Sequence, residues 1–137
     1  MSITRLSAFA LVFLAALPAG SVRSMAQMQA CATAQTQTDM NVCAAGEYKK
    51  HDAAMNQIYQ QLLAKLTDPQ QKLLLVDAER AWLAYRDKQC AFQTSGSVGG
   101  SIHPMIESDC LDEKTNVHSA ELSRQLNCQE GDPSCVH

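Results

Sequence analysis

The chain has 137 residues, of which 11 are Lys or Arg and 14 are Asp or Glu, so its formal net charge is −3. A mildly acidic chain of this size is predicted to form one small domain, and without a basic patch it is a poor nucleic-acid binder. It has no Cys-x-x-Cys motif and its His residues are scattered, so we expect neither a metal site nor a cofactor.

Residues 1–26 are predicted to be a signal peptide. Arg5 precedes an apolar run over residues 6–17, which is too short to span a bilayer. Ser24-Met25-Ala26 then fits a small-x-small cleavage site, and Ala19 is a second candidate. The mature protein is therefore expected to be periplasmic or secreted and to have no membrane span. Cys31 does not follow a lipoprotein cleavage motif, so no lipid anchor is expected.

The chain carries six cysteines, all of which follow residue 26. An even number of cysteines in an oxidising compartment predicts three disulfides. Proximity along the chain favours the pairs Cys31–Cys43, Cys90–Cys110 and Cys128–Cys135. The sequence alone does not decide the connectivity, and Cys43–Cys90 is the main rival pairing.

A first helix is predicted over residues 38–66. Thr38 is its candidate N-cap, and Asp39 lies in its first turn. Its apolar face is interrupted by Asp52 and otherwise consists of Ala44, Tyr48, Met55, Tyr59, Leu62 and Leu66.

A second helix is predicted over residues 69–92, because Asp68 can cap it and Pro69 suits its first position. It contains Trp82, the only tryptophan of the chain. Two apolar stripes predict two partner surfaces and place this helix between its neighbours. One stripe has Leu75, Ala78, Trp82 and Arg86, and the other has Leu74, Ala78, Ala81, Tyr85 and Phe92.

The short turn between these two helices predicts that they are antiparallel neighbours. With equal rise along both helices, Asp52 then lies near Arg86. We therefore predict a half-buried ion pair between them that fixes the register of the two helices. The alternative is that both charged groups reach solvent at the helix edges.

The rest of the chain is predicted to be a glycine-rich loop, a third helix and a tail. Residues 93–101 are small and uncharged, as is typical of a loop, and Pro104 can open a helix over residues 104–126. Residues 128–137 form a tail with a small disulfide ring. The predicted fold is therefore a small, all-α, disulfide-stapled bundle of three main helices.

The pattern of these residues resembles a known family. Cys31 and Cys43 are followed by Asp52-x-x-Met-Asn-x-x-Tyr59, by Trp82-x-x-x-Arg86-Asp87-x-x-Cys90, and then by Gly99-Gly-Ser101, Cys110 and Thr115. This spacing resembles the small exported helical family typified by the N-terminal domain of the lysozyme inhibitor LprI. The resemblance covers nearly all of residues 27–127. It departs from the family at Met55, where Leu is usual, and at His118, where Arg is frequent.

The resemblance implies a protein-binding domain that inhibits lysozyme or a related peptidoglycan hydrolase. A glycine-rich loop held at its ends by Cys90–Cys110 would lose little freedom on binding. We therefore expect this loop to occlude the two-carboxylate cleft of the enzyme, while the acidic surface attracts a cationic lysozyme. The candidate binding residues are Ser97, Gly99, Gly100, Ser101 and His103.

Other interpretations remain open. The loop could simply connect two helices, and the domain could be a structural or accessory interaction module of the cell envelope without inhibitor activity. No motif of an enzyme active site occurs in the sequence, so we expect no catalysis. Tyr59, Trp82 and His118 are expected in the core. The acidic residues at the start of the third helix are expected to form a solvated face that suits the helix dipole.

Overall fold

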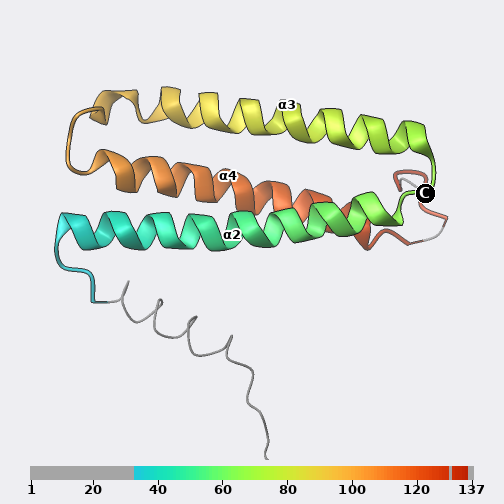
Figure 1. Cartoon of the computed structure of the whole chain (residues 1–137), viewed down its shortest axis with the longest axis horizontal. Helices are drawn as coiled ribbons and strands as arrows, with labels where there is room; N and C mark the ends of the chain where they lie inside the picture. The colour runs from blue at the N-terminus through green and yellow to red at the C-terminus, as the bar shows by residue number, and fades with distance from the viewer. Residues whose placement is uncertain (1–32, 130, 136–137) are drawn as a thin grey trace, which may run out of the picture.

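The computed structural model describes residues 33–129 and 131–135. These residues form three long helices and a short 3₁₀ helix, which are α2 (Gln37–Lys65), α3 (Pro69–Gln93), η1 (Ser95–Ser97) and α4 (His103–Leu126). α2 and α4 run in the same direction, and α3 runs the opposite way (Figure 1). The predicted all-α fold with three main helices is confirmed. The predicted signal peptide lies outside the described residues.

Polar side chains at the helix starts explain where the helices begin. The Thr36 side chain accepts a hydrogen bond from the Asp39 backbone N–H and caps α2, so the predicted cap at Thr38 is wrong. The Asp68 side chain accepts a bond from the Gln70 N–H, and Pro69 opens α3 as predicted. The predicted helix ends lie within one residue of the observed ends.

The order of the helices in space differs from the prediction. α4 lies between α2 and α3 (Figure 1), and its most extensive contacts are with α2. The second predicted helix, α3, is therefore not the central one. The short turn at residues 66–68 reverses the chain, but it does not determine which pair of helices packs most closely. Thr115 on α4 is fully buried, and a side chain this small permits close approach of helix axes.

The core lies along the contacts between the three helices. Met55, Leu62 and Leu122 form its buried centre. The half-buried side chains that pack against this centre are Ile58, Tyr59, Leu75, Trp82 and Leu126. Trp82 thus belongs to the core, and it comes from the first of the two apolar stripes on α3.

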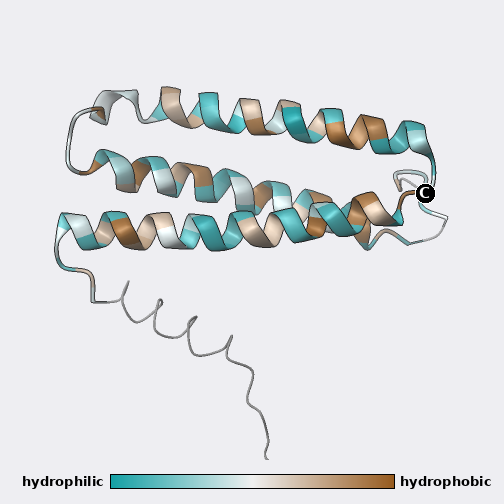
Figure 2. Cartoon of the chain, viewed as in Figure 1, coloured by the Kyte–Doolittle hydropathy of each residue, from teal (hydrophilic) through white to brown (hydrophobic). Residues whose placement is uncertain are grey.

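The second apolar stripe of α3 faces solvent. Leu74, Tyr85 and Phe92 are exposed, and so are the alanines between them. The apolar run at the start of α3 is visible in Figure 2. The prediction that this stripe packs against a neighbouring helix is wrong within the described residues. The reason is that α4 covers only one side of α3.

Disulfides hold both ends of α4. Cys90 is bonded to Cys110, and Cys128 is bonded to Cys135, as the sequence analysis paired them. The rival pair Cys43–Cys90 is therefore absent. Cys43 is itself disulfide-bonded. Its predicted partner, Cys31, lies outside the described residues.

None of the described helices combines the length and the apolar character that crossing a membrane requires.

Candidate functional site

The candidate site is the connection between α3 and α4, at the end of the bundle where α2 begins (Figure 1). Thr94 ends α3, with both its backbone N–H and its hydroxyl donating to the Cys90 carbonyl at 2.9 Å. One turn of 3₁₀ helix follows. Gly99 has φ of +84°, a backbone conformation that favours glycine. A Cβ at Gly100 would lie 3.1 Å from the Ser97 carbonyl oxygen, so this position also favours glycine.

Two of the predicted binding side chains bond within the loop. The Ser97 hydroxyl donates to the Thr94 carbonyl at 2.8 Å, so it accepts from Nδ1 of His103 at 2.9 Å. This assigns the proton of the neutral imidazole to Nδ1. The other ring nitrogen, Nε2, lies 3.8 Å from a carboxylate oxygen of Glu107. Ser97 and His103 therefore shape the loop. The Ser97 hydroxyl proton and the His103 Nδ1 proton are both used inside it and are not available to a partner protein.

The loop is also attached to its surroundings. The side-chain amide of Asn41 on α2 donates to the Ser101 carbonyl at 2.9 Å. The Gly100 N–H bonds the Ser97 carbonyl at 2.9 Å, and the Cys90–Cys110 disulfide ties α3 to α4 beside the loop. A segment held by this many bonds is already ordered before it binds anything.

The outward surface of this loop end carries exposed apolar side chains. Val98 and Ile102 are exposed in the loop, and Val42 is exposed on the first turns of α2. The backbone of Gly99, Gly100 and Ser101 is exposed between the two loop side chains. The arrangement can present a fixed apolar tip with flanking hydrogen-bonding groups to another protein.

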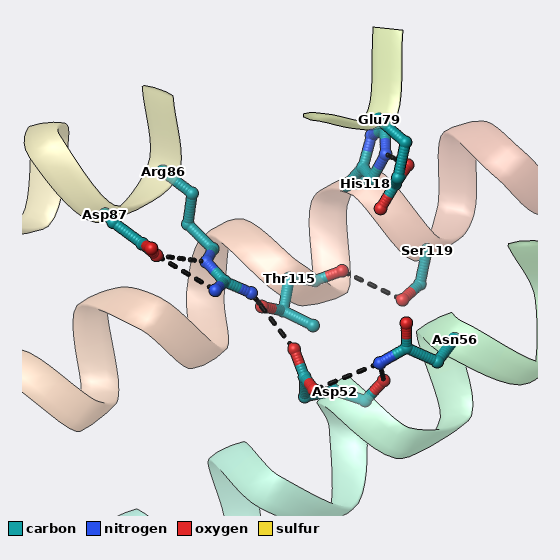
Figure 3. A network of polar contacts seen from close by, with 8 residues as sticks. All are labelled: Asp52, Asn56, Glu79, Arg86, Asp87, Thr115, His118 and Ser119. Carbon is teal, nitrogen blue, oxygen red and sulfur yellow. Dashed lines mark hydrogen bonds and ion pairs between the residues drawn. The ribbon is translucent and has the colours of Figure 1, made fainter. Parts of the chain in front are cut away.

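A charged network joins the three helices further along the bundle (Figure 3). Arg86 on α3 bonds Asp52 on α2 at 3.0 Å, so the predicted ion pair is present. The same guanidinium bonds Asp87 at 2.9 Å, and its Nη1 lies 3.5 Å from the hydroxyl of Thr115 on α4. The Arg86 side chain is 7% exposed and that of Asp52 is 31% exposed, so only the arginine is buried.

Aromatic rings complete the surroundings of Arg86. Its guanidinium carbon lies 5.2 Å from the Trp82 ring centre and 5.5 Å from the Tyr48 ring centre, within the range of cation–π attraction. Burial lowers the pKa of Arg86, but the bonds to Asp87 and Asp52 outweigh burial and raise it. Burial raises the pKa of the Tyr48 hydroxyl, against the opposing effect of Arg86. Arg86 therefore stays charged and serves as a structural cross-link.

His118 occupies a second polar position in the core. Its ring stacks on Trp82 with centroids 4.0 Å apart, and its Nε2 lies 2.8 Å from Glu79. Its Nδ1 lies 3.3 Å from Glu121. Burial lowers the pKa of His118, but the hydrogen bonds to the two carboxylates outweigh burial and raise it. The second carboxylate oxygen of Glu79 is buried without a partner among the described residues.

Glu79 was not among the predicted site residues, although its position in the sequence carries a signal. Glu79 follows Leu75 by four residues and precedes Trp82 by three, so it lies on the same helical face as both. A carboxylate at such a position requires a buried partner. The histidine predicted for the core, His118, is that partner.

The acidic residues at the start of α4 are not all free. Asp112 bonds Nδ1 of His51 on α2 at 2.6 Å. Burial raises the pKa of Asp109, and the neighbouring Asp112 carboxylate raises it further. Glu113 is exposed and has Lys114 beside it at 3.8 Å. These residues form a mixed, partly paired acidic surface next to the loop.

The tail brings Cys128, Asp132 and Cys135 together, with ligand atoms within 4.8 Å of one another. The two sulfurs are joined in a disulfide and so cannot act as thiolate ligands. The tail is therefore a closed ring, and no metal site is inferred there.

The structure places all five predicted binding residues in the connection between α3 and α4, with Ser97 at the end of η1 and His103 at the start of α4. Tyr59, Trp82 and Arg86 pack between the helices, and Asp52 is half-buried beside Arg86. The outward side chains Val98 and Ile102 were not singled out in the sequence. The glycines in the sequence predict a turn, but they do not indicate which neighbouring side chain points outward.

Comparison with known proteins supplies the remaining evidence. The family model described as lysozyme inhibitor LprI matches residues 24–122. An uncharacterised protein of Rhizobium meliloti (strain 1021) is 34% identical, and the match covers 73% of this chain and 81% of that protein. The uncharacterised protein YecT of Escherichia coli (strain K12) is 32% identical, and the match covers 71% of this chain and 70% of that protein. No solved structure matches the chain.

Proposed function

The chain belongs to the lysozyme inhibitor LprI family, and we propose that it is an exported protein that binds a lysozyme or a related peptidoglycan hydrolase and inhibits it. The proposed contact is the loop end of the bundle, residues 97–103, with Val98 at its tip. The role of the protein is binding, and no catalytic step is assigned to it.

The observation that carries this proposal is the ordered loop itself. Hydrogen bonds from Asn41, Ser97 and His103 hold it, and the Cys90–Cys110 disulfide fixes the two helices beside it. Because the loop is ordered before binding, little conformational entropy is lost in the complex. An exposed apolar tip on a rigid support is a feature typical of protein–protein contact sites.

The chemistry of the tip suits an enzyme cleft. Glycosidase clefts contain a pair of carboxyl groups flanking the scissile bond. Val98 and Ile102 would contact the walls of such a cleft, while the Ser101 hydroxyl and the loop backbone offer hydrogen bonds to its polar groups. The overall net charge of −3 favours the approach of a cationic enzyme.

The experiment measures lysis of a bacterial suspension by lysozyme with and without the purified protein. Two variants are compared with the wild type: Val98→Asp in the loop and Val117→Asp on α4. Val98 is 69% exposed and Val117 is 56% exposed, so neither change disturbs the core. Both variants alter the net charge equally, which makes Val117→Asp a matched control for electrostatic attraction.

We expect the wild type and Val117→Asp to slow lysis and Val98→Asp to lose most of this effect. Loss of inhibition in both variants, or in neither, would rule out the loop as the contact. If the wild type leaves lysis unchanged, the inhibitor function is refuted. In that case, co-purification with another envelope protein would favour the accessory-module alternative.

A further inference from the structure

The exposed face of α3 has the properties of an interface. Leu74, Tyr85 and Phe92 all lie on it, and these are three of the eight large apolar side chains that are exposed in the described structure. Ala78 and Ala81 are exposed between them. Leu74 and Ala78 also border a pocket beside α4, but both residues stay exposed. The loop end proposed to bind the hydrolase does not include this face.

The spacing on this face follows a coiled-coil pattern. Leu74, Ala78, Ala81, Tyr85, Lys88 and Phe92 are separated by alternating steps of four and three, and Lys88 is the one charged member. Steps of this kind place residues on one seam that a second helix can pack against. The seam from Leu74 to Phe92 is about 27 Å long, at a rise of about 1.5 Å per residue. This length suits packing against another long helix.

We infer that the face is a self-association surface and that its occupant is α3 of a second copy of this chain, packed antiparallel. In a register centred on residue 83, Phe92 lies against Leu74 of the second copy. Tyr85 then lies against Ala81 of the second copy, and Lys88 lies against Ala78, so a long side chain meets a small one in these two pairs. Two-fold symmetry repeats each contact, which makes the seam complementary to itself.

The charges along the seam agree with this register. Lys88 lies toward the side of the seam on which Asp77 flanks it, and the two residues are five and six positions from residue 83. An antiparallel pair therefore brings Asp77 beside Lys88 of the second copy, twice by symmetry. In a parallel pair, the two-fold axis would run along the seam and place Asp77 and Lys88 of the second copy on the opposite flank, so this contact would not form. Among the described residues, the ion pair of Asp77 is with the highly exposed Arg80, at 3.7 Å, so Asp77 is available for this contact.

The test is the mass of the purified protein by sedimentation equilibrium, at chain concentrations up to about 1 mM, where even a weak dimer is populated. We expect a dimer whose dissociation constant rises by about tenfold or more in Tyr85→Glu, as for a central interface aromatic. Val117→Glu on α4 is the matched control, because Val117 and Tyr85 are both 56% exposed. It should leave the dimer unchanged.

A charge exchange tests the antiparallel register. Asp77→Lys and Lys88→Asp are each expected to weaken the dimer, and the double variant is expected to restore it. A monomer at every concentration would overturn the inference. So would a dimer that is insensitive to Tyr85→Glu, or one that the double exchange does not restore. The assay contains no lysozyme, so its outcome is independent of the proposed inhibitor function.

Discussion

Arg86 is the residue that connects all three helices. It is buried on α3, it bonds Asp52 on α2, and it lies beside Thr115 on α4 (Figure 3). Two aromatic rings, Tyr48 and Trp82, flank the guanidinium. A buried ion pair of this kind adds little net stability over an apolar substitute, but removing one partner alone is strongly destabilising. Its role is to fix the register of the helices.

Replacing Arg86 is therefore expected to be costly. Arg86→Met should lower the free energy of unfolding by about 2 kcal/mol, because the buried Thr115 hydroxyl and the half-buried Asp52 lose their shared donor. Arg80→Met is the control on the same helix. Its exposed pair with Asp77 should be worth no more than about 0.5 kcal/mol. Urea unfolding measures both, and equal losses in the two variants would show that Arg86 has no special structural role.

His118 is expected to make stability depend on pH. The carboxylates of Glu79 and Glu121 raise its pKa in the folded protein. The stabilisation is therefore complete below the unfolded pKa of about 6.5, and it is lost as the pH rises through the higher folded value. The wild type should be less stable at pH 9 than at pH 6, and His118→Gln should reduce this difference. Denaturant midpoints at the two pH values test it, and an unchanged difference would contradict the assignment.

At the scale of elements, the disulfide beside the loop is expected to matter for both stability and binding. The Cys90–Cys110 bond spans 20 residues, and replacing both cysteines by alanine should lower the free energy of unfolding by about 3 kcal/mol. The loop would then be less ordered, and inhibition of lysozyme should weaken. Thermal unfolding and the lysis assay measure the two effects.

The tail ring provides the control for this prediction. The Cys128–Cys135 bond spans only 7 residues and lies beyond the last helix. Replacing both of its cysteines by alanine should leave inhibition intact. If inhibition falls equally in both double variants, the loop has no particular dependence on its own disulfide.

The helices were predictable because local signals determine them. Asp68 and Pro69 mark the start of α3, and the observed helix bounds follow the apolar periodicity closely. The Asp52–Arg86 contact was predictable because each charged residue interrupts the apolar face of its helix. The two residues also lie at similar distances along the helices from the turn that joins them. These features depend only on short segments and on the direction of the chain.

The packing of the helices was less predictable. A short turn makes α2 and α3 antiparallel, but α2 packs most extensively on α4. That choice depends on side-chain volume at distant positions, such as the fully buried Thr115. The buried Glu79 was missed for a related reason, because its partner His118 lies on another helix and is distant in the sequence.

At the scale of the whole molecule, the bundle separates two surfaces. The loop end presents Val98 and Ile102, and the outer face of α3 presents the seam from Leu74 to Phe92. In an antiparallel dimer, the two loop ends would lie at opposite ends of the assembly, so each copy could bind one hydrolase molecule. Tyr85→Glu is therefore expected to weaken the dimer and to leave inhibition per chain unchanged. Sedimentation and lysis are both measured on this variant. Loss of dimer formation together with loss of inhibition would contradict the separation of the two surfaces.

Contact between the loop end and the hydrolase can be measured by amide hydrogen exchange of the chain with and without a saturating amount of lysozyme. We expect the enzyme to slow exchange at residues 97–103 and at the adjoining start of α2, while the outer face of α3 keeps its rates. Slowed exchange confined to other parts of the bundle, or unchanged exchange in the loop, would contradict this contact.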